Sequence, residues 1–208
     1  MRKIKSSNEN EMVYEFLKME IDSERYNEPL EAILSKLCIS KDIIKNGNIM
    51  SKQENSLRIK VLKIFRGYRN REIFENFPKN IEWVWTEFSN EDLSKIIYIE
   101  YCYWNELSNY TGSPLDAAKT ILSGKTVYDV PNDRAIEAAE KIKAGYKFPP
   151  MIFLTDKTEK RYIILEGHCR MTAYGLAPDS FQNVSVLLGY CTGKELDKWY
   201  GKMPPQSE

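Results

Sequence analysis

The most informative segment of the chain is Tyr162-Ile163-Ile164-Leu165-Glu166-Gly167-His168-Cys169-Arg170-Met171-Thr172-Ala173-Tyr174. An apolar run of strand length meets a glycine, and a segment of helix-like composition follows. A strand that turns through glycine into a helix presents free backbone N–H groups and the positive end of the helix dipole. That geometry suits an anion, most often a phosphate. His168, the only histidine of the chain, and Arg170 would add donors at the same place.

The segments on either side extend this strand–glycine–helix corner into a small domain. Pro149-Pro150 imposes an extended entry into an apolar strand, and a polar turn at 156–160 brings the chain back as its partner. Ser113-Pro114 is typical of a helix start, and Gly145 of a helix end. The pattern predicts strands at 151–154, 162–165 and 184–188, and helices at 114–122, 133–144, 168–176 and 194–200.

The first half of the chain is less regular. Residues 1–28 are polar and charge-rich, and we interpret them as a frayed terminus with one short apolar docking helix. Helical spacing recurs from Leu30 to Leu37 and again from 57 to 68, although residues 57–61 also alternate like a strand. Aromatic residues concentrate between 65 and 110, where Trp83-Val84-Trp85 predicts a strand and 91–103 a helix. Packing in the core explains these aromatic residues better than the stacking of bases does.

We therefore predict an α+β fold with a small mixed sheet and packed helices, together with a helical, aromatic-rich N-terminal half. Three ranges follow from the pattern: a polar helical segment at 1–56, an aromatic-rich subdomain at 57–112 and the corner domain at 113–208. Composition restricts the functional class. Lys and Arg number 30, as do Asp and Glu, and this balance argues against a surface that binds nucleic acid over its whole extent.

The cysteine pattern and the hydropathy of the chain indicate the cellular compartment in which the protein works. The four cysteines are scattered without a CxxC pair, so neither a zinc site nor a disulfide framework is expected. No apolar run approaches the length of a membrane span, and the basic start is not followed by the apolar region of a signal peptide. We expect a cytoplasmic protein with reduced thiols.

One stretch, 57–71, is locally basic and contains no acidic residue. Its functional interpretation is contact with the phosphates of DNA, RNA or a nucleotide, and its alternative is a solvated helix face. The cations are Arg58, Lys60, Lys63, Arg66, Arg69 and Arg71.

The order of elements around the corner resembles the ParB/sulfiredoxin superfamily over residues 113–190. ParB-like domains carry an NGxxxPxxV segment and then a GERRxxA motif, and the free serine kinases and sulfiredoxins carry DGHHR and GCHR versions. Here the corresponding residues are Gly167-His168-Cys169-Arg170 followed by Ala173. In sulfiredoxins the cysteine directly follows the glycine, whereas here it comes one residue later. Sulfiredoxin chemistry is therefore not expected.

The resemblance implies a nucleotide site. In these families the motif holds the phosphates of ATP or CTP, usually with Mg²⁺. Carried over by position, Gly167, His168, Cys169 and Arg170 would bind the nucleotide, Glu166 would bind the metal, and Glu166 and His168 would be catalytic. A thiol at Cys169 would have a lowered pKa if it lay near the helix N-terminus and two cations. Asp133 and Arg134 are further candidates to face the ligand.

Three functional hypotheses result. The first is a nucleotide- or phosphate-binding protein, as a Mg²⁺-dependent phosphotransferase or a nucleoside triphosphatase acting at 166–170. The second is a non-enzymatic DNA- or RNA-associated or regulatory module that uses the basic stretch 57–71. The third is a degenerate relative whose corner holds only a structural anion.

Overall fold

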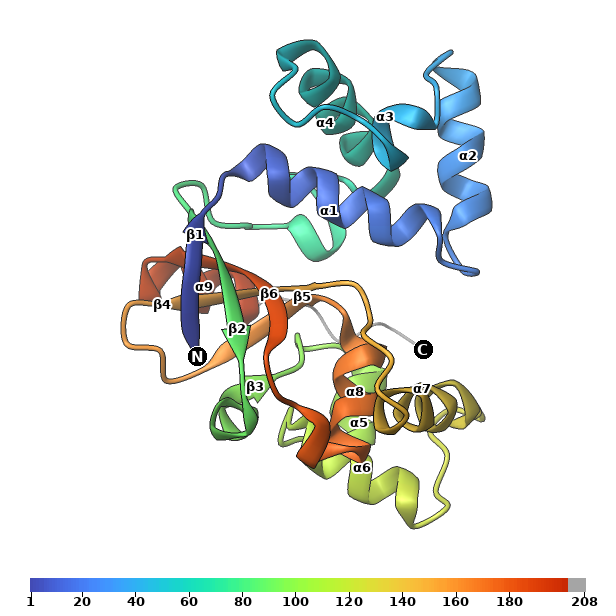
Figure 1. Ribbon diagram of the computed structural model, residues 1–208, viewed down its shortest axis with the longest axis vertical. Helices are drawn as coiled ribbons and strands as arrows, with labels where there is room; N and C mark the ends of the chain where they lie inside the picture. Colours follow the sequence, from blue (N-terminus) through green and yellow to red (C-terminus); the bar gives the residue numbers. More distant parts are fainter. Residues whose placement is uncertain (202–208) are drawn as a thin grey trace.

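The computed structural model of the protein describes residues 1–201, which form a six-stranded mixed sheet with helices on both faces (Figure 1). The strand order is β1-β2-β6-β4-β5-β3. β4 runs parallel to β6, and β3 runs parallel to β5, whereas the other neighbouring pairs are antiparallel. The predicted fold class, α+β with a small mixed sheet, is confirmed. The strands are β1 (Arg2–Ser6), β2 (Glu82–Phe88), β3 (Ile96–Ile97), β4 (Met151–Asp156), β5 (Tyr162–Glu166) and β6 (Val184–Cys191).

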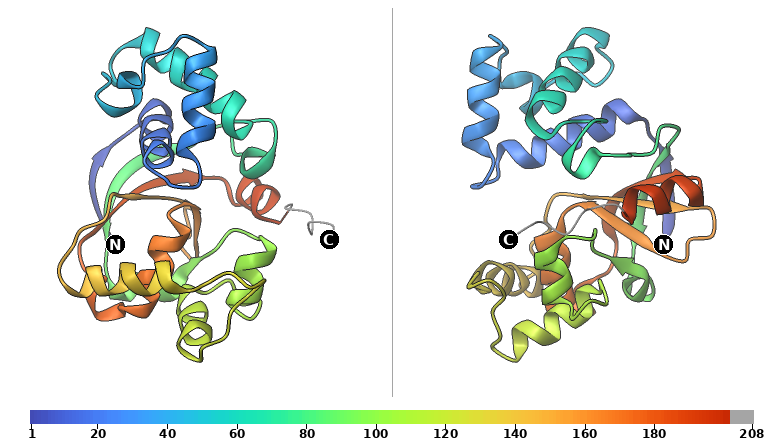
Figure 2. Two further views of the ribbon diagram at one scale, coloured as in Figure 1. Left: turned by 90° about the vertical axis from the view of Figure 1, so that its right-hand side faces the viewer. Right: turned by 180° about the vertical axis from the view of Figure 1, so that it is seen from behind.

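Two groups of helices cover the two faces of this sheet (Figures 1 and 2). One face carries α1 (Glu9–Ile21), α2 (Asn27–Lys36), α3 (Asp42–Lys45), α4 (Lys52–Arg66) and α9 (Gly193–Tyr200). The other carries α5 (Cys102–Leu107), α6 (Pro114–Leu122), α7 (Asp133–Lys143) and α8 (His168–Leu176). Short 3-10 turns lie at η1 (Glu72–Phe74), η2 (Asn90–Lys95) and η3 (Pro178–Ser180). Among residues 1–201, no helix combines the length and apolar character needed to cross a bilayer.

The apolar runs of β4 and β5 follow from burial on both faces. Along β4, Met151 and Phe153 pack into the core beneath α5–α8, while Ile152 and Leu154 pack into the core beneath α1–α4. The residues of β5 alternate between the two cores in the same way. A strand covered on both sides reads as a continuous apolar run, which explains why the sequence predicts both strands well.

The structure corrects two expectations for the first half of the chain. The interpretation of residues 1–28 as a frayed terminus is wrong, because β1 pairs with β2 and α1 buries Met12, Phe16 and Leu17 in the core. The helix expected at 91–103 is also wrong: this range contains η2, then β3, and only the start of α5. Strands from all three predicted ranges, 1–56, 57–112 and 113–208, join the same sheet.

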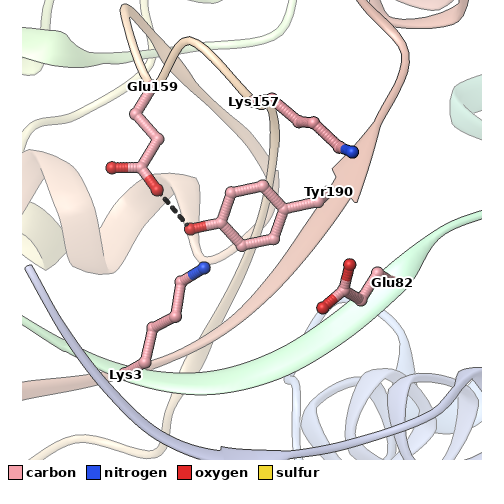
Figure 3. Close-up of a pocket in the computed structure, with 5 residues that line it drawn as sticks. All are labelled: Lys3, Glu82, Lys157, Glu159 and Tyr190. Atoms are coloured by element: carbon pink, nitrogen blue, oxygen red, sulfur yellow. Dashed lines mark hydrogen bonds between the residues drawn. The ribbon is translucent and has the colours of Figure 1, made fainter.

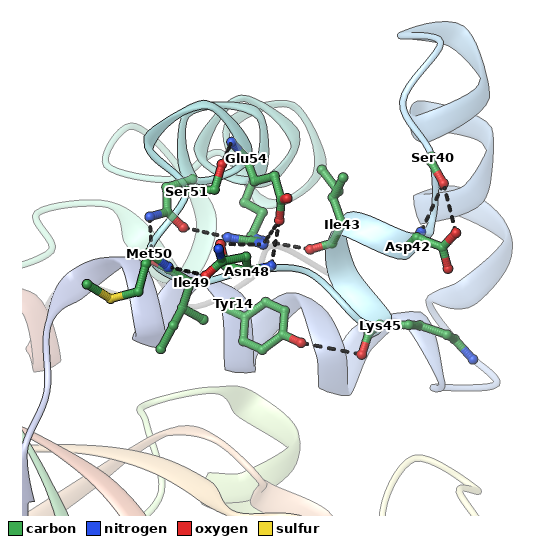
Figure 4. Close-up of polar contacts among 12 residues, drawn as sticks. Tyr14, Ser40, Asp42, Ile43, Lys45, Asn48, Ile49, Met50, Ser51 and Glu54 are labelled. Carbon is green, nitrogen blue, oxygen red and sulfur yellow. Dashed lines mark hydrogen bonds and ion pairs between the residues drawn. The ribbon is translucent and has the colours of Figure 1, made fainter.

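A buried arginine ties the loop between α3 and α4 to the helical group α1–α4. Arg58 is fully buried. Its Nε donates to the carbonyl of Ile43 at 2.7 Å, and its Nη2 contacts the carbonyl of Asn48 at 3.4 Å and Glu54 Oε2 at 2.6 Å. Figure 4 labels these three partners, Ile43, Asn48 and Glu54, together with Tyr14. The guanidinium lies 4.7 Å from the centre of the Tyr14 ring. We refer to these contacts as the Arg58 network.

Candidate functional site

Gly167 forms the corner between β5 and α8, as the sequence predicts. Its φ of 106° lies in the left-handed region that favours glycine, and a β-carbon at this position would approach Met151 Cγ to 2.5 Å. Gly167 is also the N-cap of α8, so no side chain caps the first turn of the helix. The amides of residues 168–170 have no partner within the helix, because an α-helix leaves its first N–H groups unpaired. The corner therefore directs backbone donors toward one place.

Arg170 links three segments around this corner. Its Nη1 donates to the carbonyls of Pro149 and Pro150, both at 2.7 Å, and lies 3.6 Å from Met19 Sδ of α1. Its Nη2 forms an ion pair with Glu166, four residues earlier. Both side chains remain partly accessible, at 14% for Arg170 and 19% for Glu166. The guanidinium thus holds the corner together, and an anion would share it with Glu166.

His168 packs against aromatic rings and has one unsatisfied nitrogen. Its imidazole stacks on Trp104, with ring centres 5.3 Å apart and an angle of 18° between the planes. The Nε2 atom is buried and has no hydrogen-bond partner in the structure. Burial lowers the pKa of His168 to about 3, and the positive charges of Arg66 and Arg170 act in the same direction. The ring is therefore neutral at pH 7, and its buried Nε2 atom is left without a hydrogen-bond partner.

The charges of four arginines, from four segments, influence the first two residues of α8. Arg66 of α4 and Arg170 both act electrostatically on His168. Arg25, in the loop after α1, Arg134 of α7 and again Arg170 act on Cys169. The Arg66 Nε atom is buried without a hydrogen bond, and its closest acidic group is Glu72 Oε2 at 3.4 Å. This group of four arginines, Arg25, Arg66, Arg134 and Arg170, is called the arginine cluster below.

Glu20 of α1 is the carboxyl group most perturbed by this environment. Its side chain is 8% exposed, and its Oε1 lies 3.5 Å from Arg66 Nη1. Burial raises the pKa of Glu20 to about 7, with a further contribution from the negative charge of Glu166, while Arg66, Arg25 and Arg170 oppose the shift. Arg134 forms an ion pair with Glu24 in the loop after α1. The end of α1 therefore lies against the corner.

Sequence reasoning anticipated only part of this arrangement. Glu166, Gly167, His168 and Arg170 do lie together at the corner. The charge of Arg134 acts on Cys169, and a role of Asp133 and Arg134 toward a ligand stays a prediction. Glu20, Arg25 and Arg66 were missed as members of the corner, because they approach it only through the packing of α1 and α4 on the sheet. No local signal marks them. The raised pKa of a buried glutamate is visible only after folding.

Cys169 differs from the expectation of a low-pKa thiol. The residue is exposed. Protein atoms around the sulfur, and after them the Glu166 carboxylate, raise the pKa of its thiol, and the nearby Arg170, Arg134 and Arg25 only partly oppose this effect. A raised pKa keeps the thiol protonated at neutral pH, which does not favour a nucleophilic role. Cys38, Cys102 and Cys191 are also free thiols.

The part of the chain that the structure describes contains no ready-made group of metal ligands. Within residues 1–201, no group of three or more histidine, cysteine, aspartate or glutamate side chains is arranged to hold an ion. Glu166 would have to supply a single carboxylate. Mg²⁺ commonly binds one or two carboxylates together with phosphate and water oxygens, so its association with Glu166 stays a prediction that depends on a bound phosphate.

Two surface hollows lie away from the corner. One, of about 280 Å³, is lined by Lys3, Glu82, Lys157, Glu159 and Tyr190 (Figure 3). Three of these residues contact one another: the Tyr190 hydroxyl donates to Glu159 Oε1 at 2.5 Å, and the Lys3 ammonium lies 4.3 Å from the centre of the Tyr190 ring. The other, of about 400 Å³, lies beside α2 and is lined by Glu31, Leu34, Ser35, Ile39 and Lys41. Neither hollow gathers charge of one sign.

The basic stretch 57–71 is largely occupied by internal contacts. Arg58 is fully buried and is removed from the predicted partner surface. Arg66 faces the corner, Arg69 pairs with Glu9 at 2.7 Å, and Arg71 pairs with Glu72 at 3.3 Å. The exposed residues Lys60 and Lys63 are the remaining members of the predicted set. Nucleic-acid binding through them stays a prediction.

Comparison with known proteins identified no relative of this chain. Neither the family models nor the curated proteins nor the solved structures that we searched gave a match to this chain.

Proposed function

We propose that this protein binds a phosphate-bearing small molecule, most specifically a nucleoside triphosphate such as ATP or CTP, at the N-terminus of α8. The proposal is carried by the first turn of α8, whose amides have no side-chain cap and which includes Arg170, held at the corner by the carbonyls of Pro149 and Pro150. The charges of Arg25, Arg66 and Arg134 act in addition on His168 or Cys169. Helix N-termini and arginines are the two protein features best suited to phosphate oxygens.

Each corner residue has a role in this proposal. Gly167 permits close approach of the backbone, and the amides of residues 168–170 would donate to the phosphates. Arg170 would contact a phosphate while it keeps Pro149 and Pro150 in place. Glu166 orients Arg170 and would contribute the carboxylate ligand to Mg²⁺, which would neutralise phosphate charge when bound. The order of α7, Pro149-Pro150, β4, β5 and α8 supports a ParB/sulfiredoxin-like assignment for residues 113–190.

Phosphoryl transfer or nucleotide hydrolysis is the chemistry that we infer. Preorganised amides and arginines stabilise the charge of a phosphoryl group in the transition state. His168 is neutral at pH 7, so it would act as a hydrogen-bonding group and not as a cation. Glu20, whose pKa is raised to about 7, is the better candidate to accept a proton from an attacking hydroxyl or water.

Isothermal titration calorimetry with ATP, CTP and GTP, each with and without Mg²⁺, tests the proposal. We expect binding that weakens at least tenfold in Arg170→Ala and several-fold in Arg134→Gln, because each removes one cation near the phosphates. Lys143→Gln is the matched control, since Lys143 is an exposed cation at the opposite end of α7 and should leave binding unchanged. Absence of binding at millimolar nucleotide, or equal binding by wild type and Arg170→Ala, would overturn the proposal.

A further inference from the structure

The exposed side of α4 carries positive charge and no negative charge. Its outward-facing residues fall within about a third of the helix circumference, because successive residues are about 100° apart. These exposed residues are Lys52, Gln53, Ser56, Lys60, Lys63 and Ile64. The three lysines form no ion pair with any residue of the range 1–201. We refer to this surface as the lysine face.

The Arg58 network explains why the lysine face contains no carboxylate. Glu54 is the only acidic residue of α4. Its Oε2 atom accepts from Arg58 Nη2 at 2.6 Å and from the backbone N–H of Asn48 at 2.7 Å (Figure 4). The apolar side chains of Val61 and Leu62 are buried in the core. The acidic group of α4 is therefore engaged by the buried arginine, and only cations remain on the exposed side.

The other helices of similar length do not share this pattern. Lys119 of α6 pairs with Asp116 at 2.7 Å, and Lys143 of α7 pairs with Glu140 at 2.8 Å. The helices α2 and α9 expose acidic residues among their lysines. Charges of both signs are typical of a helix face that contacts only solvent. Among helices of eight or more residues within 1–201, α4 alone exposes lysines with neither an acidic neighbour on the same face nor an ion-pair partner.

The dimensions of the lysine face suit duplex DNA. Lys52 and Lys63 are separated by about 16 Å along the helix axis. Duplex DNA carries about one negative charge per 1.7 Å of its axis, so each lysine has a phosphate within reach. An α-helix with its side chains is about 10–12 Å across and enters the major groove of B-form DNA, whereas the major groove of A-form RNA is too narrow. The helix α4 lies at the end of the molecule opposite α6 (Figures 1 and 2).

We propose that the lysine face of α4 binds duplex DNA through its phosphate backbone. This inference goes beyond the proposed function and does not depend on it, because it uses no residue of the corner at α8. The lysines neutralise phosphates, and the exposed amide of Gln53 supplies a donor and an acceptor beside them. The balanced total of 30 basic and 30 acidic residues restricts DNA contact to this local surface.

The test is fluorescence anisotropy with the full chain and a labelled duplex DNA of about 20 base pairs, between about 50 and 200 mM NaCl. We expect wild type to bind with a plot of log affinity against log salt whose slope is about −2.7 or steeper, since each neutralised phosphate contributes about −0.9. The triple variant Lys52→Gln/Lys60→Gln/Lys63→Gln should bind at least about tenfold more weakly at the lowest salt and should lose about 2.7 of that slope. If the triple variant does not fold, each single substitution should lower the slope by about 0.9.

A second triple variant separates the lysine face from total charge. Lys160→Gln/Lys194→Gln/Lys198→Gln removes three exposed lysines outside α4, so it has the same net charge and should keep the DNA affinity of wild type. An equal loss in this control overturns the proposal, because net charge alone would then explain the binding.

Three further results would also overturn the proposal. One is the absence of DNA binding by wild type at about 50 mM NaCl and about 100 μM protein, where even non-specific binding is detectable. Another is unchanged binding by the α4 triple variant. The third is binding of duplex RNA or polyglutamate as tightly as duplex DNA, because the partner would then be another class of polyanion. The α4 triple variant should bind ATP like wild type, and a loss of both ligands would contradict the independence of the two sites.

Discussion

Two arginines of this protein make nearly the same contacts in different surroundings. Arg58 and Arg170 each form an ion pair with a glutamate four residues earlier, Glu54 or Glu166. Each also contacts two backbone carbonyls of an earlier segment, those of Ile43 in α3 and Asn48 for Arg58 and those of Pro149 and Pro150 for Arg170. Judged by their own contacts alone, both would be loop-holding side chains.

The neighbours of the two arginines differ. The Arg58 network is closed: Asn55 Oδ1 accepts from Nη1 at 2.5 Å, and the Tyr14 ring lies against the guanidinium. Near Arg170, His168 Nε2 is buried without a hydrogen-bond partner, and Arg66 Nε forms an ion pair with Glu72 at 3.4 Å but no hydrogen bond. Unsatisfied buried groups are rare because each lowers stability, so the unpaired Nε2 atom of His168 distinguishes the corner from the closed Arg58 network.

The largest effect that this comparison predicts is on stability. Arg58→Ala removes a buried charge and leaves two carbonyls and Glu54 without their partner, so we expect the free energy of unfolding to fall by about 3 kcal/mol or more. Chemical denaturation followed by circular dichroism measures this loss. Lys60→Ala, an exposed neighbour on α4, is the control and should change stability by less than about 0.5 kcal/mol.

Arg170→Ala sharpens the same comparison. Its partners are partly accessible to water, so we expect a smaller loss of stability, about 1–2 kcal/mol, than for Arg58→Ala. If Arg170→Ala lost as much stability as Arg58→Ala and still bound nucleotide like wild type, both arginines would have a structural role only. That result would contradict the proposal that Arg170 binds a ligand.

A second prediction concerns pH. Glu20 titrates near 4.5 in the unfolded chain and near 7 in the folded protein, so the folded state binds the extra proton between these values. Stability contributed by this group is present below pH 4.5 and is lost as the pH rises toward 7, by at most about 3 kcal/mol. Glu20→Gln removes this dependence, and its stability relative to wild type should increase from pH 4.5 to pH 8.

Comparing the two proteins at each pH cancels the opposite effect of His168. The lowered pKa of His168 makes stability fall as the pH decreases from about 6.5 to about 3, and this is common to wild type and Glu20→Gln. Urea denaturation of both proteins at several pH values is the measurement. If the difference in unfolding free energy between wild type and Glu20→Gln stayed constant from pH 4.5 to pH 8, the pKa of Glu20 would not be raised by folding.

The smallest predicted effect is on thiol reactivity. Cys169 and Cys38 are both exposed, but only Cys169 lies at the corner. A bound nucleotide should slow the alkylation of Cys169 several-fold and leave that of Cys38 unchanged, which mass spectrometry of labelled peptides measures. Equal rates at Cys169 with and without nucleotide would argue against a ligand at the start of α8.

Local signals were sufficient for much of the corner domain. Ser113 caps α6 and Pro114 occupies its first turn, as predicted, and β4, β5 and α8 lie where the apolar runs and Gly167 indicate. These elements were predictable because their caps and apolar patterns are encoded within a few residues.

The remaining features depend on distant contacts. All of β1 is exposed, and its pairing with β2 joins residues about 80 positions apart, so no apolar alternation identifies it as a strand. Arg58 reads as one more surface cation of an amphipathic helix until the loop after α3 folds over it. In the same way, Glu20 and Arg66 join the corner only when α1 and α4 pack on the sheet.

The most direct test of the central claim is a nucleotide titration followed by ¹⁵N–¹H NMR of the backbone amides. If phosphates bind at the start of α8, the amides of His168, Cys169 and Arg170 should show the largest shifts, while those of Asn55 and Arg58 in the closed network should not move. No shift at residues 168–170 with saturating MgATP, or larger shifts in the Arg58 network, would contradict the account.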